Sequence, residues 1–129
     1  MITISADLAR ARWQAVVDFL APTATLHVYS GTRPGAVADE PTADAVLLVE
    51  LPLTAALADD GITLNGDPQG ALIADNGTAT WARLLTADGT PALDLDISAE
   101  SGAGDIRLAG ADTRLYRGGA FTLTAALLR

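Results

Sequence analysis

Few side chains in this sequence are suited to catalysis. It has one histidine, His27, no cysteine, no lysine, and no serine in a G-x-S-x-G nucleophile elbow. The lack of cysteine excludes a thiolate zinc site, an iron–sulfur cluster and a cysteine nucleophile. His27 alternates with Leu26 and Val28, which predicts a solvent-facing imidazole in a strand rather than a catalytic or metal-binding one.

The carboxylates are numerous but do not form a recognisable site. Most of the aspartates in predicted turns adjoin glycine or proline, as is typical of such positions, and no EF-hand spacing is present. These turn aspartates are Asp59, Asp60, Asp67, Asp75, Asp88, Asp105 and Asp112. Nothing selects a glycosidase-type pair, because separation in space decides such a pair. Asp94 and Asp96 share one face of a predicted strand. They could share a cation or meet arginines of another chain, although a solvated strand face is the preferred interpretation. We therefore expect no catalytic residue, no metal and no cofactor, and a protein that is not an enzyme.

Charge and hydropathy exclude further classes. The 129 residues carry a formal net charge of −8, with a sequence pI near 4.3, which disfavours nucleic acid and anionic membranes as partners. The glycines match no phosphate-binding loop, which would also need a lysine. No signal peptide or membrane-spanning stretch is recognisable, so the chain is expected to stay soluble in the cell that makes it.

The N-terminal segment, residues 1–24, is predicted to be an arm followed by a helix. Ser5 is a suitable N-cap, Asp7 suits the first turn, and Pro22 follows an expected end near Leu20. One helix face is predicted to be apolar and to pack on the domain's own sheet or on a neighbouring subunit. This face comprises Leu8, Ala11, Ala15, Val16, Phe19 and Leu20.

The remainder, residues 25–129, has the period-two pattern of strands separated by turns. Eight strands are expected, at residues 25–30, 46–51, 62–64, 71–74, 78–85, 92–98, 105–108 and 120–128, with Pro52 closing the second. The pattern predicts an all-β fold, an antiparallel β-sandwich or jelly roll with one N-terminal helix. Residues 31–44 form one long irregular loop, which could carry contacts or be a simple connection.

Two features suggest association. Leu127 and Leu128 are adjacent in the last strand, so one of them needs a cover from outside its own sandwich. Trp13 lies at the margin of the apolar helix face, where an aromatic residue can anchor a contact or pack in the core. The alternating arm, residues 1–5, could also add a strand to another sheet edge.

Three segments in order resemble a family of small proteins encoded among the structural genes of tailed bacteriophages and prophages. The segment 25–34, T-L-H-V-Y-S-G-T-R-P, is similar to the family's a-L-x-I-Y-T-G-x-x-P. The segment 47–51, L-L-V-E-L, follows it, and 75–84, D-N-G-T-A-T-W-A-R-L, is similar to a-S-G-T-A-x-W-F-R. Ala82 replaces the family's usual aromatic residue, and the segment after Asp96 lacks its glycine.

The resemblance implies a non-enzymatic virion structural protein, most often a capsid decoration or cement protein on the head surface. Its partners would be the major capsid protein or other virion proteins, and it would form a homo-oligomer, a dimer or trimer. Arg10, Arg12, Arg114 and Arg117 would be rim contacts to acidic capsid surface. The alternatives are a tail, neck or connector protein, and a carbohydrate-binding module with Trp81 as its sugar platform.

Overall fold

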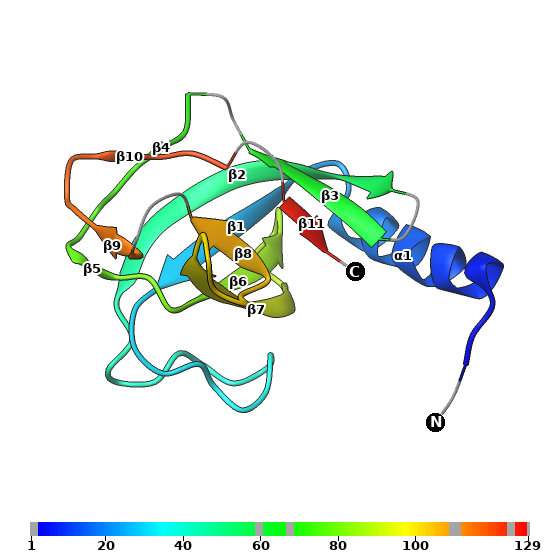
Figure 1. Ribbon diagram of the computed structural model, residues 1–129, viewed down its shortest axis with the longest axis horizontal. Helices are drawn as coiled ribbons and strands as arrows, with labels where there is room; N and C mark the ends of the chain where they lie inside the picture. Colours follow the sequence, from blue (N-terminus) through cyan, green and yellow to red (C-terminus); the bar gives the residue numbers. More distant parts are fainter. Residues whose placement is uncertain (1–2, 59–60, 67–68, 109–111, 124–125, 129) are drawn as a thin grey trace.

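The computed structural model describes residues 3–58, 61–66, 69–108, 112–123 and 126–128, with the backbone alone at 126 and 127. In these described segments, one helix precedes the strands (Figure 1). In chain order the elements are α1 (Ala6–Leu20), β1 (Ala24–Tyr29), β2 (Leu47–Ala58), β3 (Gly61–Gly66), β4 (Ala71–Leu72), β5 (Gly77–Thr78), β6 (Trp81–Thr86), β7 (Pro91–Ala99), β8 (Ile106–Leu108), β9 (Arg114–Leu115), β10 (Ala120–Phe121) and β11 (Ala126–Leu128).

Helix α1 begins and ends where the sequence predicts. The Oγ of Ser5 accepts a hydrogen bond from the Leu8 amide at 3.1 Å, and Asp7 occupies the first turn. These contacts satisfy a free amide at the helix start and place a negative charge near the positive end of the helix dipole. The chain leaves the helix after Leu20 in an extended conformation, before Pro22.

The described strands form one main sheet with the order β11-β3-β2-β1-β6-β7-β8. Neighbouring strands are antiparallel from β11 to β7, and β8 then pairs with β7 in parallel. Two short ribbons, β4 with β10 and β5 with β9, lie at the end of the molecule opposite α1 (Figure 1).

Strand register gives the sheet one apolar face. A cross-strand row on this face comprises Val49, Val28, Ala82 and Leu95, and the next comprises Leu51, Leu26, Leu84 and Leu93. All but Leu93 of these side chains are buried. The face continues to β8, where Ile106 pairs with Ile97. Since successive side chains of a strand point to opposite faces, the row between these two lies on the other face, and it is polar.

Helix α1 packs on this hydrophobic core through Trp13, Val16, Val17 and Leu20. Their spacing of three, one and three residues places them on one side of the helix. The helix contacts β2, β3 and β6. Of the predicted apolar face, only Val16 and Leu20 pack on the chain's own sheet. Leu8, Ala11, Ala15 and Phe19 are exposed, so the packing of these four on a neighbouring subunit stays a prediction. The helix has two apolar stripes. The stripe of Trp13, Val16, Val17 and Leu20 packs on the sheet, and the stripe of Leu8, Ala11, Ala15 and Phe19 faces outward.

The mostly β fold with one N-terminal helix is confirmed, but the antiparallel sandwich or jelly roll is not. The described strands make one curled mixed sheet and two short ribbons, and the β7–β8 pairing is parallel. Strand β2 also continues through Pro52 to Ala58. That is tolerated because β3 pairs with β2 only from Leu53 onward, which leaves Pro52 beside β1 alone.

Two leucines in α1 provide a matched test of helix docking. Leu20→Ala should lower the free energy of unfolding by about 2–5 kcal/mol, because Leu20 is 2% exposed in the core. Leu8→Ala removes the same atoms from a side chain that is 55% exposed, and its effect should stay within about 0.5 kcal/mol. Urea unfolding measures both. Equal losses from the two substitutions would contradict this docking.

Candidate functional site: the outer face of the N-terminal helix

The polar face of the sheet brings titratable side chains from four strands together. The row between the two apolar rows comprises Glu50, His27, Arg83 and Asp94, on β2, β1, β6 and β7. Arg83 donates from Nε to Asp94 Oδ1 at 2.8 Å and from Nη2 to Oδ2 at 3.1 Å. Both side chains are buried, and the hydrogen bonds to Asp94 hold the pKa of Arg83 above its ordinary value.

The loop of residues 31–44, here called the strap, covers this face. Arg83 Nη1 donates to the Asp39 carbonyl at 2.7 Å, and Arg33 forms an ion pair with Asp96 at 2.9 Å. Asp44 accepts hydrogen bonds from the side chains of Thr32 and Thr42, which lower its pKa. The strap is therefore an ordered loop held by the sheet.

Asp94 and Asp96 are thus each paired with an arginine of their own chain, and Asp94 is buried rather than solvated. This corrects the expectation of a solvated strand face. Among the described residues, no three histidine or acidic side chains are grouped as metal ligands would be. His27 instead lies 3.7 Å from Glu50.

Trp81 is not an exposed platform. Its side chain is fully buried, and its ring stacks on Tyr29 with 4.4 Å between centroids and an interplanar angle of 11°. The guanidinium carbon of Arg83 lies 5.4 Å from the centre of the same indole. A sugar ring has no access to this indole face in the folded chain, so the residue named for carbohydrate binding is a packing residue.

An exposed apolar stripe lies on α1. Its outer face, defined here as Leu8, Ala11, Ala15 and Phe19, points away from the sheet. Leu8 is 55% and Phe19 54% exposed. Large exposed side chains arranged in a helical stripe mark contact surfaces on soluble proteins.

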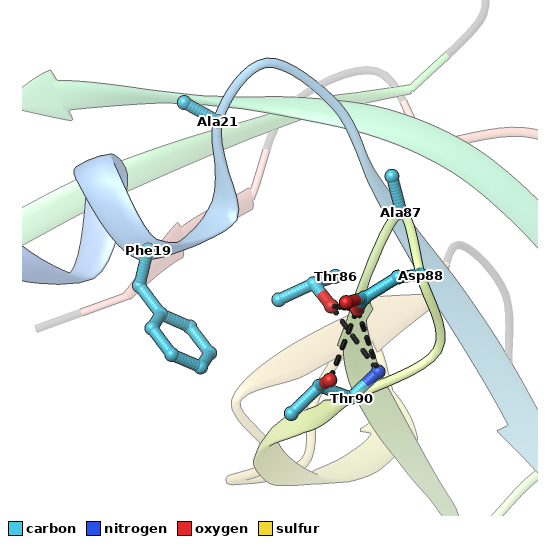
Figure 2. Close-up of a pocket in the computed structure, with 6 residues that line it drawn as sticks. All are labelled: Phe19, Ala21, Thr86, Ala87, Asp88 and Thr90. Atoms are coloured by element: carbon cyan, nitrogen blue, oxygen red, sulfur yellow. Dashed lines mark hydrogen bonds between the residues drawn. The ribbon is translucent and has the colours of Figure 1, made fainter.

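An open pocket of about 370 Å³ adjoins Phe19. The phenyl ring and the β6–β7 turn face each other across it, as Figure 2 shows. The turn is the hairpin predicted from Ala87-Asp88-Gly89, with Gly89 at a φ of +90°. Thr86 and Thr90 donate their side-chain hydroxyls to Asp88 Oδ1, and the Thr90 amide does so at 3.3 Å. These bonds lower the pKa of Asp88.

The structure separates the residues predicted for an interface. Arg10 and Arg12 are exposed on α1, whereas Trp13 is half-buried against the core with Arg12 over its ring at 5.8 Å. Arg114 and Arg117 are exposed near β9, at the opposite end of the molecule (Figure 1). The four arginines therefore do not form one rim.

The closing strand, β11, holds the two leucines that were predicted for an interface. Leu128 is 5% exposed and belongs to the hydrophobic core. It is therefore not the leucine of the pair that would need a cover from a neighbouring chain. It lies in β11, where it pairs with Ile62 at the sheet edge. The side chain of Leu127 lies outside the described part of the chain.

Sequence reasoning missed the site at Phe19 and Asp88. It placed Phe19 on a helix face expected to pack on the sheet or on a neighbouring subunit, and it treated Asp88 as a turn residue. The sequence did contain a signal for it, because the spacing of Trp13, Val16, Val17 and Leu20 forms a second apolar stripe on the helix. When this second stripe packs on the sheet, Phe19 points outward.

Comparisons with protein-family models, curated proteins and solved structures find no match to this chain. Among the described residues, no helix has the length and apolar character needed to cross a membrane.

The two arginine–aspartate pairs provide a matched test of the polar face. Asp94→Asn leaves the buried charge of Arg83 without its counterion and should cost about 3–5 kcal/mol of unfolding free energy. Asp96→Asn breaks a pair whose side chains are 41% and 62% exposed, and should cost about 1 kcal/mol or less. Chemical denaturation distinguishes them, and equal costs would show that the strap does not bury the first pair.

His27 predicts a pH dependence. Burial, the largest cause, lowers its pKa from 6.5, and Arg83 lowers it further, while Glu50 opposes the shift. The folded chain thus binds this proton less readily than the unfolded chain. Stability should be full above about pH 6.5 and fall as the pH drops through the lowered value.

The variant His27→Asn has a neutral side chain at this position, so its unfolding free energy should depend less on pH below about pH 6.5. Unfolding free energies between pH 7.5 and about pH 5 measure the effect, in a range above the titration of ordinary carboxylates. A wild-type stability that rises on acidification through this range would contradict the assignment.

Proposed function

We propose that this chain is a non-enzymatic structural protein of a tailed-phage particle, a capsid decoration or cement protein. The observation that carries the proposal is the outer face of α1, where Leu8 and Phe19 are more than half exposed. The virion as the place of that contact is proposed from the resemblance of segments 25–34, 47–51 and 75–84 to phage structural proteins.

The distribution of polar groups supports a binding rather than a catalytic role. On the sheet, the basic side chain of Arg83 is used to bind Asp94 and the strap. His27 lies beside Glu50 and Tyr29. These groups stabilise the fold. The outer face of α1 is apolar, with the charged Arg12 along one edge and Asp7 and Asp18 along the other, which is typical of a protein contact.

A decoration protein does not need one strong contact. Its copies bind a repeating shell, and symmetry converts modest affinity at each site into high occupancy. The outer face of α1 is small, which suits shallow repeated contacts to the major capsid protein, to other virion proteins or between copies of the chain. A homo-oligomer at the capsid surface is the arrangement we propose.

Particle labelling tests this proposal. Immunogold with an antibody against the native chain, on phage particles that carry it, should label the head surface. Label confined to the tail or neck would replace decoration with the connector alternative. A protein absent from purified particles, although the antibody recognises it in lysates, would contradict a virion role.

A variant pair links the labelling to the outer face. The double substitution Leu8→Ser and Phe19→Ser should reduce the particle-bound amount by about tenfold or more, since central apolar contacts dominate binding energy. Leu72→Ser is the control, because Leu72 is 72% exposed on β4, far from α1. Circular dichroism should show both variants folded. Equal occupancy for both variants would rule out the outer face as the contact.

A further inference from the structure

Arg12 and Phe19 share one edge of the outer face. They are seven residues apart, which is two helical turns, so they differ by about 20° around the helix and by about 10 Å along it. Arg12 is exposed, and within the described residues it forms no ion pair. Its guanidinium lies over the Trp13 ring, 5.8 Å from the ring centre. That contact uses the face of the planar group, so its N–H donors can still bind a carboxylate outside the helix.

Asp88 lies across the pocket from Phe19, near the C-terminal end of α1. The pocket beside Phe19 places the β6–β7 turn next to this edge (Figure 2). The three hydrogen bonds from Thr86 and Thr90 all reach Oδ1, and none within the described residues reaches Oδ2. Asp88 is thus a fixed, exposed carboxylate with one oxygen available, next to an exposed aromatic ring.

The positions of these groups are self-complementary. When two antiparallel helices are related by a two-fold axis perpendicular to both, each presents the same edge to the other with its direction reversed. A residue at one end of the edge in the first copy then meets the residue at the other end of the edge in the second copy. The symmetry forms this contact twice. With the axis midway between residues 12 and 19, the guanidinium of one copy meets the phenyl ring and Asp88 of the other.

We propose that the outer face of α1 binds a second copy of this chain, with Arg12 inserted beside Phe19 and Asp88 of the partner subunit. The proposal deepens the proposed function at the same surface by naming which subunit occupies it. A guanidinium can bind the carboxylate and stack on the ring at once. The charge complementarity is reciprocal, so one contact type closes a dimer.

Two further features fit this pairing. Ala11 and Ala15 are small and exposed between Leu8 and Phe19, which lets two helices approach to the usual 8–10 Å. Asp7 and Asp18 lie on the other edge of α1. A contact centred on the Arg12 edge leaves these carboxylates in solvent and avoids opposing them in a chain whose net charge is −8.

A charge swap on the purified chain tests the proposal. Sedimentation equilibrium should show a monomer–dimer equilibrium for the wild type. Arg12→Glu alone or Asp88→Arg alone should raise the dissociation constant by about tenfold or more. The double variant carries the same pair with reversed charges, and its dissociation constant should return to within about threefold of the wild type.

Two controls distinguish loss of the Arg12–Asp88 contact from a general charge effect and from loss of folding. Arg10→Glu makes the same charge change on the other side of α1 and should leave the dissociation constant within about twofold of the wild type. If Asp88→Arg does not fold, as judged by circular dichroism, Phe19→Ser replaces it and should weaken the dimer by a similar factor. A wild type that stays monomeric at all concentrations, or single variants that dimerise like the wild type, would overturn the proposal.

These outcomes are independent of the particle experiment. A chain that is monomeric in solution yet labels the head would refute the dimer and leave decoration standing. A chain that dimerises through Arg12 and Asp88 yet is absent from particles would refute decoration and leave the dimer standing.

Discussion

The contact between α1 and the apolar face of the sheet determines which surfaces of the molecule remain free. Alternation along β1, β2, β6 and β7 gives the sheet one face of leucine, valine and alanine, and this face must be removed from water. The helix covers part of it with Trp13, Val16, Val17 and Leu20. Because one side of α1 is used for this contact, Leu8 and Phe19 are held outward at fixed positions.

The polar face of the sheet buries charged side chains. An isolated buried guanidinium would be costly, so Arg83 is bound by both oxygens of Asp94 and by the Asp39 carbonyl. The last of these bonds orders the strap over the sheet. Stability and the placement of the strap are thus coupled through the Arg83 side chain.

Much of the fold follows from the sequence. The Ser5 cap, the helix end, the strands around Leu26, Leu64 and Leu95, and the Asp88-Gly89 turn all lie where local patterns place them. Capping, alternation and turn chemistry act over a few residues, which is why they can be recognised in one sequence.

Other features depend on contacts between distant segments. The parallel pairing of β8 with β7 and the docking of one stripe of α1 rather than the other are examples. Both stripes are apolar in sequence, and only the shape of the sheet decides between them. The same applies to Asp94, whose arginine partner is 11 residues away on the neighbouring strand, and to the pocket that joins Phe19 to Asp88.

The orientation of α1 is the central claim, and thiol accessibility tests it most directly. The chain has no cysteine, so Leu8→Cys and Leu20→Cys each introduce a single reactive group. In dilute solution at one pH, Leu8→Cys should react with a maleimide as an exposed thiol does. Leu20→Cys should react at least about tenfold more slowly, since its reaction requires local opening. Equal rates, or faster reaction at residue 20, would contradict the account.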